Sequence, residues 1–248
     1  MSKISVESHG DIALLRLDNG VTNTIGRSVP REVMAALEEI RGGCGGMVLA
    51  GGQKFFSAGL ALPELMSLDR EEMSAFWEEF FRMTLELYTF PLPTASAICG
   101  HAVAGGCVLA LTTDFRFGTS DGKKIGLNEM RLGVPVPYLT DMMLRQVVGD
   151  RAATEMLFRG DFYSLSQGFQ FGLVSELCPP ESVEERAIER MAELAGFNRP
   201  AMMASKENRV EEIRLRYQKD AEAKNAFFME CWFSEPVQTR LAEAARKL

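Results

Sequence analysis

Two short segments of the sequence could hold and polarise a carbonyl group. Residues 57–60, Ser-Ala-Gly-Leu, have small side chains that let the main chain approach a ligand closely. In residues 100–107 glycines precede an apolar run that predicts a helix over residues 105–111. The first N–H groups of such a helix lack intrahelical partners and carry positive potential. They would suit a developing oxyanion.

A third segment, residues 125–135, holds the carboxylate of Glu129 among apolar neighbours. Burial there would raise the pKa of Glu129 toward the range of a useful base. Each segment also has a plain structural interpretation: a tight turn, an ordinary loop, and a solvated surface glutamate. His101 is more simply a packed or backbone-bonded histidine than a base. Taken singly, none of these patterns assigns chemistry.

The elements that must position these segments are strands alternating with helices, followed by helices alone. This order predicts one α/β domain with a helical C-terminal portion, and 248 residues without a flexible linker suit that size. An amphipathic helix is expected to start at Asp69. We expect strands at residues 4–7, 12–17, 47–50, 94–99 and 115–118, and later helices including 138–148 and 151–158.

The composition excludes several classes of function. The net charge is −7 and no Lys/Arg run occurs, so a broad nucleic-acid surface is not expected. The five cysteines form no CxxC pair, which argues against a zinc site and a disulfide framework. The N-terminal residues Glu7, Asp11 and Arg16 interrupt any signal-peptide core. These features predict a cytoplasmic protein without a metal.

A membrane span is also not expected, although residues 87–113 contain no Asp, Glu, Lys or Arg. Pro91 and Pro93 stop a helix there, because each lacks an N–H group and crowds the preceding turn. A buried strand, a turn and a buried helix fit this stretch better.

In this order, the three segments resemble the motifs of the crotonase (enoyl-CoA hydratase/isomerase) family. FSAGLALPEL at residues 56–65 is similar to F-x-A-G-x-D-[LI]-x-E-[LM], and GHAVAGGCVLALTTD at 100–114 to G-x-A-x-G-G-G-x-x-L-A-x-x-x-D. NEMRLGVPVP at 128–137 resembles the turn P-E-x-x-x-G-x-x-P. Weaker similarities at residues 17–25 and 164–179 extend the resemblance over almost the whole chain.

The resemblance implies a crotonase-like spiral of β-β-α turns over residues 1–195. Residues 196–248 would be a helical trimerisation region of the same family unit. It also implies a homotrimer or a dimer of trimers, and an acyl-CoA thioester as the ligand. CoA is then part of the substrate, and no separate cofactor is expected.

The resemblance implies site residues as well. The N–H groups of Leu60 and Gly105 would hold the thioester oxygen, and Glu129 would be the acid/base. Contacts to the adenine and pantetheine parts of CoA would fall near Ala58 and Leu62.

Three further residues are candidate CoA contacts. Ile25 lies in the N-terminal stretch that resembles the family. Arg27 and Lys54 are candidate partners of the CoA phosphates.

Two positions depart from the family pattern. Hydratases of the family hold a water between two glutamates, and the position of the first is Val108 here, which cannot transfer a proton. The Δ3,Δ2-enoyl-CoA isomerase branch needs only the glutamate at position 129, and residues 125–134 are similar to that branch. Ala61 replaces an aspartate that is more structural than catalytic in this motif.

We therefore predict an isomerase of fatty acid metabolism that shifts the double bond of 3-enoyl-CoA to 2-enoyl-CoA. Two alternatives stay open. One is hydration or other thioester-enolate chemistry of the same family, because a fold does not fix the reaction. The other is an acyl-CoA binding protein that has lost catalysis. The sequence leaves the length and branching of the acyl chain undefined.

Overall fold

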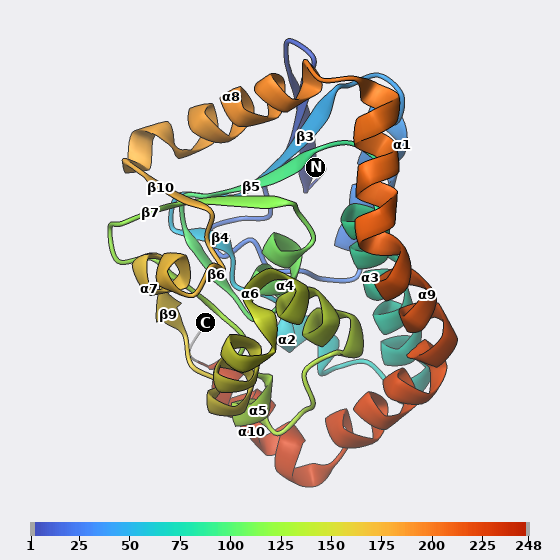
Figure 1. Cartoon of the computed structure of the whole chain (residues 1–248). Helices are drawn as coiled ribbons and strands as arrows, with labels where there is room; N and C mark the ends of the chain where they lie inside the picture. Colours follow the sequence, from blue (N-terminus) through green and yellow to red (C-terminus); the bar gives the residue numbers. More distant parts are fainter. Residues whose placement is uncertain (1–2, 247–248) are drawn as a thin grey trace.

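The computed structural model describes residues 3–246, and within them the strands form two sheets surrounded by helices (Figure 1). The larger sheet has the order β1(Ile4–His9), β2(Ile12–Leu17), β3(Gly46–Ala50), β5(Thr94–Ile98), β7(Phe115–Thr119), β10(Glu176–Cys178). In this sheet β1 and β2 are antiparallel and the later neighbours are parallel. The smaller sheet has the order β4(Phe55–Ser57), β6(His101–Val103), β8(Lys124–Gly126), β9(Tyr163–Ser164). In this sheet β4, β6 and β8 are parallel and β9 is antiparallel to β8.

The chain passes from the larger sheet to the smaller one and back through helices. β3 leads into β4, β5 into β6, and β7 into β8, and helices follow each pair. These helices are α2(Leu62–Leu65) and α3(Arg70–Tyr88), then α4(Gly105–Leu111), then α5(Glu129–Leu132) and α6(Tyr138–Arg159). The spiral of β-β-α turns expected from the sequence is therefore confirmed.

The central strands of the larger sheet are buried on both faces, which is why β3 and β5 are apolar or small throughout rather than alternating. On one face Leu15 and Leu49 pack in the main core with α1(Val29–Ile40), α3 and α4. On the other face Leu14 and Val48 pack against α8(Val183–Ala195), which crosses that face in Figure 1. The α/β core is thus layered as helices, sheet and helix.

The C-terminal helices lie beside this core. α9(Arg199–Trp232) runs along one side of the molecule and contacts α3 and α6 (Figure 1). α10(Glu235–Ala245) packs against α2 and α5, and the short α7(Leu165–Gln170) follows β9. α10 thereby lies close to α5(Glu129–Leu132), the helix that begins at Glu129.

Several local predictions are confirmed. Asp69 caps α3 through its side chain and forms a reciprocal capping box with Glu72. α4 has the predicted bounds. The helices expected at residues 138–148 and 151–158 are joined as α6, with a kink at Gly149, whose φ of 77° is not helical. Within residues 3–246 no helix is long and apolar enough to cross a membrane.

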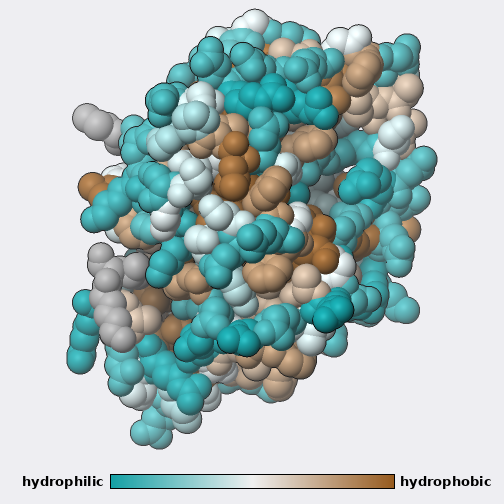
Figure 2. Space-filling model, turned by 60° about the vertical axis from the view of Figure 1, so that its left-hand side comes forward, coloured by the Kyte–Doolittle hydropathy of each residue, from teal (hydrophilic) through white to brown (hydrophobic). Residues whose placement is uncertain are grey.

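The surface carries both polar and apolar residues. Figure 2 shows one face on which hydrophilic residues predominate and hydrophobic residues gather near the centre. Apolar atoms make up more than half of an ordinary protein surface, so such patches need no special explanation.

Candidate active site

The smaller sheet brings the three sequence segments together. β4, β6 and β8 are parallel neighbours, so their carboxyl ends lie at the same edge. Ala58 to Leu60 follow β4, Ala104 and Gly105 follow β6, and Leu127 to Glu129 follow β8. Segments that are far apart in the sequence thus meet at one place through sheet topology.

The loop after β4 is held by side-chain and main-chain hydrogen bonds. The Ser57 hydroxyl donates to the Asn23 carbonyl oxygen (2.7 Å) and accepts from the Gly59 N–H (3.2 Å). The Ile25 N–H donates to the Gly59 carbonyl oxygen at 2.8 Å. These bonds fix the main chain immediately before Leu60.

Gly59 allows this loop to lie against the start of α4. Its φ is +90°, and a Cβ atom there would be 2.8 Å from the Gly105 nitrogen. A Cβ atom on Gly105 would be 3.4 Å from the Leu60 nitrogen. The Leu60 and Gly105 amides are therefore neighbours, and side chains on these glycines would separate them.

Both amide hydrogens are available to a ligand. Among residues 3–246, no protein acceptor receives a hydrogen bond from the N–H of Leu60 or Gly105. Ala104, directly before α4, has φ 50° and ψ −122°, an unusual conformation for a residue with a side chain. Leu60 and Gly105 both line the same cavity. The pair is arranged as an oxyanion hole would be.

Glu129 lies in this cavity as the first residue of α5. Its side chain is buried, with 8% of the residue exposed, and its Oε2 atom has no hydrogen-bond partner among the described residues. Burial raises the pKa of Glu129 to about 7, while hydrogen bonds from the main chain at Glu129 and Asn128 oppose the rise. A carboxylate with such a pKa can take up and release a proton near neutral pH.

The cavity has a volume of about 620 Å³ and is mainly apolar. Within the stretch from residue 3 to residue 246, Glu129 is the only carboxylate that lines it. Val108 of α4 lies in the wall, almost fully buried. Apolar side chains in the lining also include Leu62, Trp77, Phe80, Leu132, Val134, Phe228, Trp232 and Leu241.

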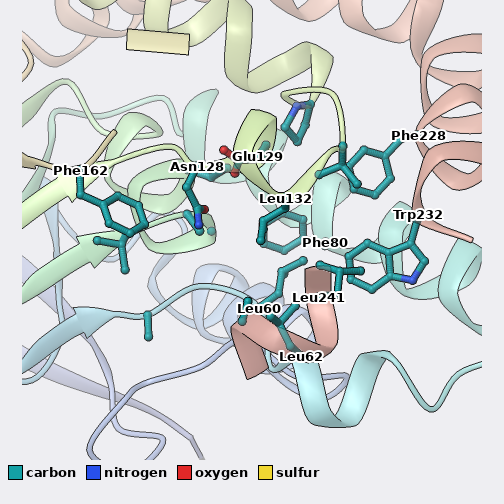
Figure 3. Close-up of a pocket in the computed structure, with 18 of the residues that line it drawn as sticks. Leu60, Leu62, Phe80, Asn128, Glu129, Leu132, Phe162, Phe228, Trp232 and Leu241 are labelled. Carbon is teal, nitrogen blue, oxygen red and sulfur yellow. The ribbon is translucent and has the colours of Figure 1, made fainter. Parts of the chain in front are cut away.

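The two ends of the cavity differ in character. Phe162 lies at one end, and Lys124 and His101 lie near it, because β8 pairs with the strand that follows Phe162 and the Lys124 N–H donates to His101; all three are at least partly exposed. Phe80, Phe228 and Trp232 belong to the other and are buried. Figure 3 shows Phe162 on one side, Phe228 and Trp232 on the opposite side, and Asn128, Glu129 and Leu132 between them. The carboxylate thus lies between a partly polar end and a buried aromatic end.

His101 has a structural role in this arrangement. Its Nδ1 atom accepts the Lys124 N–H at 3.0 Å, and its ring lies 5.2 Å from that of Phe55. Burial lowers its pKa, and Lys123 and Lys124 lower it further. The packed, backbone-bonded interpretation of His101 fits these contacts.

Five of the residues expected from the sequence come together in the cavity lining: Ala58, Leu60, Leu62, Gly105 and Glu129. Three others lie outside it. Ile25 is fully buried beside Gly105. Lys54 is exposed with its ammonium group 5.9 Å from the Phe55 ring, and Arg27 pairs with Glu72.

Other lining residues were not identified as site residues from the sequence. Asn128 lines the cavity beside Glu129, and its Oδ1 atom is buried without a partner among residues 3–246. The aromatic residues of α3 and α9 recur at helical spacing, as core residues usually do. Their place in the cavity wall becomes visible only in the structure, where the two helices dock. No cluster of three or more potential metal ligands occurs among the described residues.

Comparisons with known proteins agree with this geometry. The model of the family described as "Enoyl-CoA hydratase/isomerase" matches residues 7–243. The chain belongs to the enoyl-CoA hydratase/isomerase family. The crotonase resemblance seen in the sequence is therefore confirmed.

Similar members of the family carry two different activity names. Human mitochondrial enoyl-CoA delta isomerase 1 is 28% identical over 90% of this chain and 76% of its own. A probable enoyl-CoA hydratase, echA17, of Mycobacterium avium is 31% identical over 79% of this chain and 76% of its own. The crystal structure of the human mitochondrial Δ3,Δ2-enoyl-CoA isomerase has a TM-score of 0.95 at 26% identity, covering 99% of this chain and 97% of that one. The fold is thus that of the crotonase family, whose members act on acyl-CoA thioesters.

Proposed function

We propose that this protein is an enoyl-CoA isomerase that moves the double bond of a 3-enoyl-CoA to position 2. The observation that carries the proposal is that three groups line one cavity. They are the buried carboxylate of Glu129, with a pKa of about 7, and the main-chain N–H groups of Leu60 and Gly105. No acceptor within residues 3–246 receives a hydrogen bond from either N–H group. The substrate class follows from the family.

The reaction needs one base and one oxyanion site. The Leu60 and Gly105 N–H groups hold the thioester oxygen, which makes the C2 protons more acidic. Glu129 removes one of these protons, and the electrons move into a dienolate whose negative charge lies on the thioester oxygen. The protonated Glu129 then delivers the proton to C4, and the double bond is left between C2 and C3.

The surroundings of Glu129 favour isomerisation over hydration. Addition of water requires a water molecule held and activated beside the double bond, and polar partners are needed to hold it. Val108 offers none at the position where family hydratases have the first of their two glutamates. Val134 and Leu132 also line the cavity. An apolar wall keeps water from the dienolate and raises the pKa of Glu129.

Hydration is the second candidate, because a relative that is 31% identical is named as a probable hydratase. Asn128 gives this candidate a structural basis. Its Oδ1 atom is unpartnered among residues 3–246 and could accept a hydrogen bond from a water molecule next to Glu129.

Two substrates separate the candidates. The purified protein is incubated with a 3-enoyl-CoA and, separately, with the matching 2-enoyl-CoA, and the ultraviolet absorbance of the conjugated thioester is followed. Isomerisation gives a rise with the first substrate and only a small loss with the second, because both reactions end at the same equilibrium mixture of the two isomers. Hydration gives a steady loss with the second, and that result would replace the proposed function.

The variant Glu129→Gln supplies the control. It should lower the rate at which the absorbance rises with 3-enoyl-CoA by at least about 10³-fold, because the amide cannot accept the C2 proton. Circular dichroism establishes that the variant is folded. If neither substrate reacts but CoA esters still raise the melting temperature, the alternative of an acyl-CoA binding protein gains support.

Two features remain predictions. Lys54 and Arg27 are still candidate phosphate partners, and exposed Lys124 at the partly polar end of the cavity is a further one. The homotrimer or dimer of trimers implied by the family, with residues 196–248 in its contacts, is likewise a prediction.

A further inference from the structure

A second cavity lies directly beyond the aromatic end of the first. It has a volume of about 400 Å³ and shares Trp77, Pro137 and Phe228 with the 620 Å³ cavity. Its other lining residues include Phe158 and Phe227, which are 75% and 57% exposed. The second cavity is therefore mainly apolar, although Asp141, Lys224 and Asn225 also line it, and it reaches the protein surface.

The partition between the two cavities is a pair of stacked rings. The rings of Trp77, from α3, and Phe228, from α9, lie 3.7 Å apart with an angle of 17° between their planes. Both residues are almost fully buried, with 2% and 4% exposed. The Trp77 Nε1–H donates to the Asn225 Oδ1 atom at 3.3 Å, which ties the indole to α9 one turn before Phe228.

We propose that the Trp77–Phe228 stack is the end wall of the acyl pocket and sets the longest acyl chain that the protein accepts. This inference rests on the proposed function only in taking an acyl-CoA as the ligand. The reacting carbons would lie near Leu60, Gly105 and Glu129, and the polar CoA part would occupy the partly polar end of the cavity. The rest of the acyl chain then extends toward the opposite end, where it meets the stack. The second cavity is a blocked extension of the same path.

The size of the effect follows from burial of the chain. Each methylene buried in an apolar pocket tightens binding roughly three- to fourfold. Affinity should therefore rise with chain length until the chain reaches the stack, and then stop rising or fall. A longer chain must fold back or separate the rings of Trp77 and Phe228, which are packed against each other and hydrogen-bonded to α9.

The test uses saturated acyl-CoA thioesters of about 6 to 16 carbons and measures dissociation constants by isothermal titration calorimetry. Because these ligands do not react, the result is independent of the isomerase assay. Phe228→Ala removes one ring of the stack and joins the cavities. The longest chain that still improves binding should increase by at least about two carbons, and chains beyond the wild-type limit should bind roughly tenfold tighter.

Phe227→Ala is the matched control, because Phe227 precedes Phe228 but lines only the second cavity. It should leave the chain-length limit unchanged. If Phe228→Ala proves unstable, Phe228→Leu opens the wall partly and should move the limit in the same direction.

Three results would overturn the proposal: a folded Phe228→Ala protein with the wild-type limit, an equal change in Phe227→Ala, or wild-type affinity that still rises at the longest chain. If the wild-type protein shows no isomerase activity but its chain-length limit moves in Phe228→Ala as predicted, the proposed function is rejected and the proposal for the Trp77–Phe228 stack still stands.

Discussion

At the scale of single residues, Glu129 is the proposed acid/base, and its environment is unusual for a carboxylate. It is a carboxylate in an apolar wall, with one oxygen lacking a partner within residues 3–246. The same burial that makes Glu129 a base near neutral pH makes its ionised form unfavourable in the folded protein.

This cost predicts how stability depends on pH. The pKa of Glu129 is about 7 in the folded protein against an ordinary value of 4.5, so the folded state holds the proton more tightly. Its contribution to stability is therefore lost as pH rises from about 4.5 through about 7. Glu129→Gln avoids this loss, and above about pH 7 it should be more stable than the wild type by on the order of 3 kcal/mol.

The measurement is urea unfolding of both proteins at about pH 5 and about pH 8. The difference in the free energy of unfolding should be small at the lower pH and large at the higher one. Glu39→Gln, at an exposed position of α1, should show no such trend. An equal difference at both pH values would mean that Glu129 is not buried as described.

At this scale the sequence predicted some of the site. Gly59, Gly105 and Glu129 stand in short motifs whose glycines and isolated carboxylate are visible locally. The aromatic residues of α3 and α9 that line the cavity have no such signal, because aromatic residues at helical spacing are the normal content of a core. Their place in the cavity depends on how the two helices dock.

At the scale of elements, the contact between β4 and α4 aligns the two proposed oxyanion donors. A Cβ atom on Gly106 would be 2.1 Å from the Ser57 carbonyl oxygen. The obstacle is main chain and cannot rotate away, so α4 would have to move off β4.

Gly106→Ala should therefore lower both stability and activity. We expect a loss of about 1–3 kcal/mol in the free energy of unfolding, from overpacking. The value of kcat/KM for 3-enoyl-CoA should fall by about 10²–10³-fold as the Gly105 N–H is displaced. Gly43→Ala, at an exposed position where a Cβ would contact only the Ile40 carbonyl oxygen at 3.8 Å, is the control. A fully active Gly106→Ala enzyme would contradict this account of the site.

Five of the six strands of the larger sheet were predicted from the sequence, whereas the three-residue β10 and the strands of the smaller sheet were not. Strands such as β2 and β3 are five or six residues long and strongly apolar. β4, β6 and β8 have only three residues each and are interrupted by glycines and polar residues. Their pairing comes from long-range contacts, so local pattern offered no sign of a second sheet beyond the family resemblance.

At the scale of the whole molecule, an ion pair between a buried lysine and a partly exposed aspartate anchors α9 to the core. Lys206 of α9 is 5% exposed and donates from its Nζ atom to Asp114 Oδ2 and to Thr94 Oγ1. Asp114 also accepts hydrogen bonds from the N–H and hydroxyl groups of Thr94, at the start of β5. Burial lowers the pKa of Lys206, and Asp114 opposes this change.

Lys206→Met should destabilise the protein by about 3 kcal/mol, because it leaves the Asp114 carboxylate without its cation. Thermal or urea unfolding measures this loss. Adding Asp114→Asn should restore some of the stability, which a simple packing defect would not allow. Lys219→Met, at an exposed position of the same helix, should change stability by less than about 0.5 kcal/mol.

The course of α9 could not have been read from the sequence. Charges of both signs surround the few residues through which it is buried, and these include a lysine. A charged helix of this kind is usually solvated. The sequence indicated a helical C-terminal portion near the acyl pocket, but not where its helices would lie.

The most direct test of the central claim follows the hydrogen that Glu129 is proposed to move. A 3-enoyl-CoA carrying deuterium in place of both hydrogens at C2 is converted in ordinary water, and the product is examined by mass spectrometry and NMR. If one water-shielded carboxylate carries the proton, a substantial fraction of the 2-enoyl-CoA should keep both deuterium atoms, one at C2 and one at C4. Product with deuterium only at C2 and hydrogen from water at C4 would contradict the account.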